Sequence, residues 1–98
     1  MNALLSSRRS AIVDLCQRHG VHRLDLFGSA TVQEAPADYD FLVDFGALQE
    51  GYANAYFGLL EGLQGLLDAP VDLVVDAAIR NPYFRRSIER QRVALYAA

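Results

Sequence analysis

Two short segments carry the architecture of this chain: LDLFGS at residues 24–29 and DYDFLVDF at residues 38–45. In both, apolar and acidic side chains alternate with a period of two, which indicates β-strands buried on one face. The first strand is expected over residues 21–27, before a Gly-Ser pair. One face of the second strand would hold Tyr39, Phe41, Val43 and Phe45, and the other would hold Asp38, Asp40, Leu42 and Asp44.

Helices and further strands are expected on both sides of this pair. Apolar side chains with helical spacing, and an N-cap asparagine followed by proline, predict three helices. The helices are placed at residues 3–19, 51–68 and 82–91, with strands at 71–76 and 93–96. The fold class is therefore α/β, a small mixed β-sheet with helices packed on one face, in the order α-β-β-α-β-α. The other face, lined with aspartates, would be left open.

Length and composition limit the function classes. Ninety-eight residues predict a single domain, 1–98, because a domain usually takes about 100–200 residues. No segment approaches the ~18 apolar residues of a membrane-spanning helix or resembles a secretory signal, so we expect a cytoplasmic protein without a membrane partner. The single cysteine, Cys16, cannot form an internal disulfide, and its place on an apolar helix face indicates a core residue.

The charge is divided unevenly along the chain. All nine cationic side chains are arginines, and the net charge is −3. Residues 77–98 contain five arginines and one glutamate, a net charge of +4, so residues 1–76 carry −7. The acidic total argues against general nucleic-acid binding, which depends on phosphate neutralisation. The arginine-rich end could contact a triphosphate or a partner, or could be a solvated amphipathic helix.

Three carboxylates are candidates for a metal site. Asp38 and Asp40 lie on one face of a strand, about 7 Å apart at ~3.4 Å per residue. Asp72 opens the next strand and reaches the same place if the two strands are neighbours. Magnesium prefers such oxygen ligands, and two ions held together form a clamp for displacement at phosphorus. The plainer interpretation is that these aspartates are solvated, as we expect for Asp44 and Asp76 at the far strand ends.

Gly28 and Ser29 are candidates for binding phosphate. They follow a strand and precede a possible helix start, where a glycine lets the backbone approach a ligand and free N–H groups favour anions. The Ser29 hydroxyl could donate to a phosphate oxygen. A capped turn without a ligand is the plainer interpretation of this pair.

In combination, these residues resemble a known family signature. Leu26-Phe27-Gly28-Ser29, a short spacer, Asp38-Tyr39-Asp40, and then Val71-Asp72-Leu73-Val74 are similar to the nucleotidyltransferases of the DNA polymerase β superfamily, and most closely to its minimal prokaryotic members. The resemblance covers about residues 21–96. It implies the nucleotidyltransferase fold.

The resemblance also implies an activity. Small members of this family are often antitoxins that transfer AMP from ATP to a tyrosine of a HEPN-domain toxin, which silences the toxin. By resemblance, Gly28 and Ser29 would hold the ATP phosphates, and Asp38 and Asp40 would bind two Mg²⁺ ions. Asp72 would complete one metal site and help to deprotonate the attacking hydroxyl. The implied partners are the HEPN toxin and ATP, and a homo-oligomer is possible.

An alternative is a related protein that neutralises its partner by binding alone. The family usually has serine where this chain has Ala37, and the nine-residue spacer between Gly28 and Asp38 is short. An acidic face and the basic end could then meet a partner by charge, which mainly speeds encounter. Transfer to a small molecule or to RNA is a further alternative, although 98 residues leave little room for an acceptor pocket.

Overall fold

The computed structural model describes residues 3–47 and 50–98 and contains three helices and four strands in those ranges. The order along the chain is α-β-β-α-β-α-β, which confirms the expected α/β class. The elements are α1 (Ala3–Arg18), β1 (Arg23–Phe27), β2 (Tyr39–Asp44), α2 (Tyr52–Leu67), β3 (Val71–Val75), α3 (Pro82–Arg90) and β4 (Arg92–Ala97). Short 3₁₀ turns, η1 (Gly28–Thr31) and η2 (Asp76–Ala78), follow β1 and β3.

The four strands form one mixed sheet in the order β3-β2-β1-β4. Strand β1 is antiparallel to both of its neighbours, whereas β2 and β3 are parallel. One row of paired Cα positions crosses the whole sheet: Asp72, Asp40, Phe27 and Arg92. Because paired residues in adjacent strands point to the same face, this row sets the side chains that can meet there.

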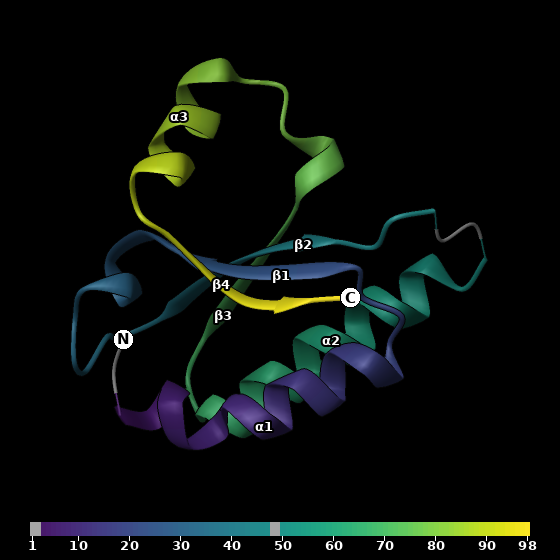
Figure 1. Ribbon diagram of the computed structural model, residues 1–98, viewed down its shortest axis with the longest axis horizontal. Coiled ribbons are helices and arrows are strands. Elements are labelled where there is room, and N and C mark those ends of the chain that lie inside the picture. Colours follow the sequence, from purple (N-terminus) through teal and green to yellow (C-terminus); the bar gives the residue numbers. More distant parts are fainter. Residues whose placement is uncertain (1–2, 48–49) are drawn as a thin grey trace.

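Helices α1 and α2 cover one face of the sheet (Figure 1). One apolar stripe of α1 is buried, and strand residues such as Phe41 and Leu24 are fully buried in the same core. Gly20, just after α1, has a left-handed φ of +68°, a conformation that commonly ends a helix. Among the described residues, no helix is long and apolar enough to cross a membrane. The buried stripe of α1 consists of Leu5, Ile12, Leu15 and Cys16.

Helix α3 lies over the opposite face, which corrects the expectation that helices pack on one face only (Figure 1). Ile88 of α3 forms a second buried cluster with Phe27 and Leu42. The alternation of β1 and β2 therefore places two apolar side chains, Phe27 and Leu42, on the face that also carries the aspartates. Helix α3 packs on this pair through Ile88. The aspartate face is open only where α3 does not reach.

Close packing explains two of the three glycines inside α2. A Cβ built on Gly58 or Gly62 would collide with His19 or Leu15 of α1, and the nearest atom to Gly62 would be 2.5 Å away. At these two positions the absence of a Cβ lets the side chains of His19 and Leu15 pack against α2. Gly65 differs, because a Cβ there would have open space within 4 Å.

This difference gives a matched pair of variants in one helix. We expect Gly65→Ala to raise the free energy of unfolding by about 0.5–1 kcal/mol, because alanine has the better helix propensity. Gly62→Ala should instead lower it, since Leu15 must move. Urea denaturation measures both. Equal effects of the two substitutions would contradict the packing described.

Candidate active site

The three predicted carboxylates come together at one end of the sheet. Asp40 of β2 and Asp72 of β3 are paired across the parallel strands, and Asp38 lies two residues before Asp40 at the start of β2. Asp40 is half-buried, whereas Asp38 and Asp72 are exposed. The hydroxyl of Tyr56 in α2 donates to the Leu73 carbonyl at 2.7 Å and holds β3 beside α2 next to Asp72.

The negative charges of these carboxylates lie close enough to repel one another, and burial and this repulsion both raise a pKa in the site. Burial raises the pKa of Asp40 above its ordinary value of 3.8, and the charges of Asp38 and Asp72 raise it further. The pKa of the Tyr56 phenol is raised by burial and then by the charge of Asp72. Three carboxylates that repel one another favour a cation or a proton between them.

The pKa of Asp40 predicts how its charge affects stability. Because the folded state raises this pKa, it binds the proton more readily than the unfolded chain, and stability falls as pH rises from about 4 through the raised value. In EDTA, we therefore expect Asp40→Asn to have a higher Tm than the wild type at pH 7, with the gap closing below pH 4. Thermal denaturation across pH measures the gap. A gap independent of pH would contradict the repulsion.

Gly28 is fitted tightly against Asp40. It opens η1 with φ of +77°, a conformation that favours glycine, and its amide donates to the Gln91 carbonyl at 3.2 Å. A Cβ on Gly28 would lie 2.9 Å from Oδ2 of Asp40. The adjacent Ser29 is exposed at the start of the same turn. The backbone of Gly28 and Ser29 therefore lies at the half-buried carboxylate.

This contact makes Gly28→Ala a sharp test. The added Cβ must displace the Asp40 carboxylate, and the left-handed backbone costs about 1–2 kcal/mol for alanine. We expect lower stability and a weakened affinity for a Mg²⁺ complex of AMP-PNP, measured by isothermal titration. Gly20→Ala is the control, since its φ is also positive but nothing lies within 4 Å of its Cβ. Equal nucleotide affinity in both variants would contradict the contact.

The donor set fits Mg²⁺ held together with substrate phosphates. In the described ranges, no group of three or more His, Cys, Asp or Glu side chains is already gathered as a metal cage. Mg²⁺ does not need one, since it is usually bound by one or two carboxylates, water and phosphate. The raised pKa of Asp40 and the Gly28 backbone beside it match that arrangement.

Sequence analysis did not predict an ion-pair network that lies on the same face of the sheet as the carboxylates. Asp25 of β1 has an exposed fraction of only 1%, and it pairs with Arg92 and, at 3.2 Å, with Arg23. Arg92 also pairs with Glu89. The pKa of Arg92 is lowered by burial but raised more by Asp25 and Glu89, so it lies above its ordinary value. The one sequence feature that pointed to this network was Asp25 itself, a charged residue between two leucines in the strand before Gly28.

Asp44 and Asp76 also differ from the expectation that they are merely solvated. Arg85 of α3 donates to Oδ1 of Asp76 at 2.9 Å and to its carbonyl at 3.1 Å. A carboxylate oxygen of Asp44 accepts from the Gly46 amide at 2.7 Å. Both aspartates border a cavity of about 60 Å³, whose other lining residues are Arg23, Asp25, Leu42 and Arg92.

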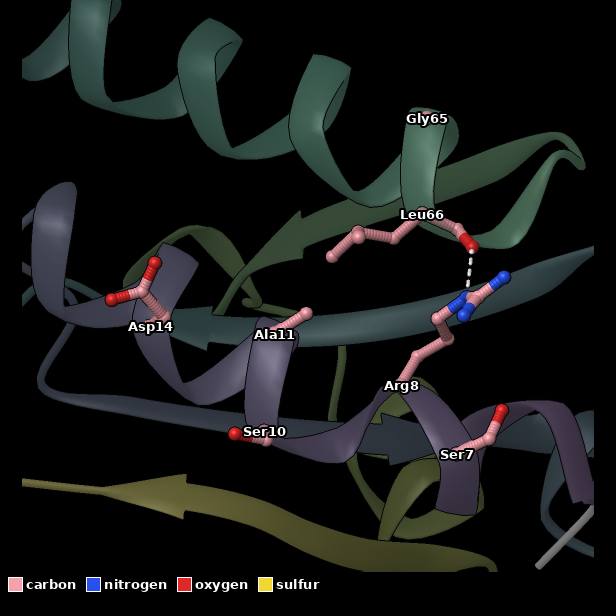
Figure 2. A pocket seen from close by; sticks show the side chains of 7 residues that line it. All are labelled: Ser7, Arg8, Ser10, Ala11, Asp14, Gly65 and Leu66. Carbon is pink, nitrogen blue, oxygen red and sulfur yellow. Dashed lines mark hydrogen bonds between the residues drawn. The ribbon is translucent and has the colours of Figure 1, made fainter.

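A larger hollow than this cavity lies elsewhere, between α1 and α2 (Figure 2). It has a volume of about 650 Å³ and is on the side of the sheet opposite α3. Its charged groups are already engaged: Arg8 donates to the Leu66 carbonyl at 3.3 Å, and Asp14 pairs with Arg18. Its other lining residues are Ser7, Ser10, Ala11 and Gly65. We therefore assign the candidate active site to the three carboxylates and not to this larger groove, whose charged groups are already hydrogen-bonded or ion-paired.

Comparison with known proteins identifies relatives. No known protein-family profile matches the chain. Two proteins of Methanocaldococcus jannaschii named as protein adenylyltransferases, MJ0128 and MJ1379, are 36% and 32% identical to it over 81 residues. Each match covers 81% of this chain and 81% of the relative.

Solved structures agree with this likeness. A structure described as a minimal nucleotidyltransferase superposes with a TM-score of 0.76 at 33% identity, covering 95% of both chains. An MNT antitoxin, solved with tri-AMPylated Shewanella oneidensis HEPN toxin, has a TM-score of 0.66 at 22% identity and shares the fold. That match covers 95% of this chain and 72% of the other. With 36% identity over four fifths of its length and the carboxylate geometry above, this chain belongs to the family of minimal nucleotidyltransferases.

Proposed function

We propose that this protein is a Mg²⁺-dependent adenylyltransferase that transfers AMP from ATP to a hydroxyl group of a HEPN-domain toxin and thereby acts as its antitoxin. The observation that carries the proposal is the pairing of Asp40 with Asp72 beside the Gly28 turn, with Asp38 raising the pKa of Asp40. In this proposal, residues 1–98 form one catalytic domain.

Relatives support this choice of activity. The two archaeal relatives are named as protein adenylyltransferases. Among structures that share the fold, one antitoxin was solved with an AMPylated HEPN toxin, and a toxin–antitoxin complex was solved with AMP-PNP. The acceptor that we propose is a tyrosine hydroxyl of the toxin.

The residues of this chain would act mainly by position and charge. The hydroxyl of Ser29 would hold the terminal phosphates, and Gly28, whose own amide is bonded to Gln91, would let them approach because it has no Cβ. Asp38, Asp40 and Asp72 would bind two Mg²⁺ ions. Bound Mg²⁺ would neutralise the phosphate charge that develops during transfer. Asp72 would accept the proton of the acceptor hydroxyl.

In the transfer reaction, pyrophosphate is the leaving group. The acceptor oxygen forms a bond to the α-phosphorus of ATP while the bond between that phosphorus and the bridging oxygen to the β-phosphate breaks. The hydroxyl proton moves to a carboxylate of the site and then to solvent. The products are an adenylylated hydroxyl and pyrophosphate, with no oxidant or reductant needed.

Intact-mass spectrometry tests the proposal. The protein encoded beside this chain, which we expect to be a HEPN protein, is incubated with the purified protein, ATP and Mg²⁺, and its mass should increase by one or more adenylyl groups. Peptide mapping then identifies the acceptor residue. An unchanged mass despite a stable complex would overturn the transferase proposal and favour neutralisation by binding alone.

A further inference from the structure

Helix α3 leaves two adjacent aromatic side chains exposed beside the carboxylate site. Tyr83 has an exposed fraction of 75% and Phe84 of 41%. A side chain of this size usually gains about 1.5–3 kcal/mol from burial. Only Ile88 of α3 is buried, so most of this short helix faces solvent. Such an exposed pair commonly marks a surface that is covered in a complex.

One of these rings, that of Tyr83, is in contact with an arginine. The Arg86 guanidinium lies over the Tyr83 ring at 5.8 Å from its centroid, and Arg90 follows one helical turn later on the same side. Arg85 and Arg92 are occupied by Asp76 and by Asp25. Within residues 3–47 and 50–98, no ion pair involves Arg86 or Arg90. Tyrosine and arginine in this arrangement are the residues most often found at the centre of protein interfaces.

The exposed surface borders the proposed active site. The rings of Phe84 and Phe27 meet edge to face with centroids 6.1 Å apart, and Phe27 is paired with Asp40 in the sheet. The cavity lined by Asp25, Asp76 and Arg92 on this side of the sheet has a volume of about 60 Å³, whereas small-molecule pockets usually have volumes of about 300–1,000 Å³. That cavity is therefore too small for a small-molecule acceptor, and the exposed side chains of α3 are the better candidates for contact with an acceptor.

We propose that Tyr83, Phe84, Arg86 and Arg90, here called the α3 patch, form the docking surface for the protein acceptor, and that the acceptor meets it with a carboxylate-bearing segment. The proposal rests on the proposed protein-directed function. The charge of the patch favours an acidic occupant, because Arg86 and Arg90 form none of the ion pairs found among the described residues, whereas Arg85 and Arg92 are already paired. Asp38, Asp40 and Asp72 beside the patch are themselves acidic. An acidic segment of the acceptor protein therefore binds α3, and this places the acceptor hydroxyl group next to the three carboxylates.

The same charges disfavour RNA as the occupant. RNA binding depends on phosphate neutralisation along a groove, and the phosphates would have to run past the three carboxylates. The protein as a whole is acidic, with a net charge of −3. An acidic peptide segment needs only the few arginines that the α3 patch provides.

Isothermal titration against the purified HEPN protein tests the surface. Tyr83→Ala and Arg86→Glu should each weaken the complex about 30-fold or more, as expected for residues at an interface centre. The matched control is Phe57→Ala, which removes an aromatic ring that is 58% exposed on α2. The affinity of the Phe57→Ala variant for the HEPN protein should equal that of the wild type. Affinity for the Mg²⁺ complex of AMP-PNP should be unchanged in all three variants, and circular dichroism checks their folds.

The outcomes separate docking from catalysis. Patch variants that break the complex, while the wild type transfers no AMP, would support the docking surface and overturn only the transferase proposal. Unchanged affinity in both patch variants, an equal loss in Phe57→Ala, or no complex with the wild type would overturn the surface. Weakened AMP-PNP binding would assign the α3 patch to the nucleotide, and tight binding of single-stranded poly(U) lost in Arg86→Glu would assign it to RNA.

Discussion

Replacing Asp40 with asparagine is expected to reduce adenylyl transfer about 10²–10³-fold, the scale of losing a group that stabilises transition-state charge. Asp40 is the half-buried member of the three carboxylates and is paired with Asp72. The asparagine side chain keeps the shape and removes the charge that would hold Mg²⁺. Initial rates with labelled ATP and the HEPN protein measure the loss.

The chain offers a matched control on the same strand face. Asp44→Asn removes a carboxylate four residues further along β2, where it accepts a hydrogen bond from Gly46. We expect near wild-type transfer in this variant, and an intact complex in both. Transfer by Asp40→Asn at more than a tenth of the wild-type rate would show that the chemistry lies elsewhere.

Breaking the buried ion pair between β1 and β4 should give the largest loss of stability. Arg92→Leu leaves the carboxylate of Asp25, which is 1% exposed, with only the half-exposed Arg23 as a partner. We expect the free energy of unfolding to fall by about 3 kcal/mol, because a buried charge loses its main partner. For a domain of this size, this corresponds to about 12 °C or more in Tm.

A double variant tests the origin of this loss. Asp25→Leu combined with Arg92→Leu removes both charges, and most of the lost stability should return. Arg85→Leu serves as the control, because its pair with Asp76 is partly solvated and should contribute less than about 1 kcal/mol. Differential scanning calorimetry measures all four proteins. A double variant as unstable as Arg92→Leu would show that packing, and not the unpaired charge, causes the loss.

Local patterns were sufficient to predict most of the backbone. Helix α1 ends within one residue of the prediction, because its buried stripe and Gly20 are encoded in adjacent turns. Strand β2 keeps the predicted alternation for the same reason. Strand β1 begins later than expected, since the Val21 amide still donates to the Cys16 carbonyl at the end of the helix.

The features that sequence analysis missed depend on long-range pairing. Asp25 and Arg92 are 67 residues apart, and nothing in either segment says that β4 lies beside β1. The position of α3 likewise depends on Phe27 and Leu42, which become neighbours only when β1 and β2 pair. The predicted site was easier, because Asp38 and Asp40 share one strand and Asp72 needs only the parallel pairing of the next.

The central claim is that Gly28, Ser29 and the three carboxylates form one site for ATP and its divalent ions. Amide signals of the labelled protein, recorded with AMP-PNP and substoichiometric Mn²⁺ in place of Mg²⁺, test it directly, since the paramagnetic ion broadens only nearby signals. We expect broadening at Gly28, Asp40 and Asp72, and sharp signals at Arg8 and Gly65 in the α1–α2 groove. Broadening in that groove, or none at Asp40 and Asp72 at saturating nucleotide, would contradict the claim.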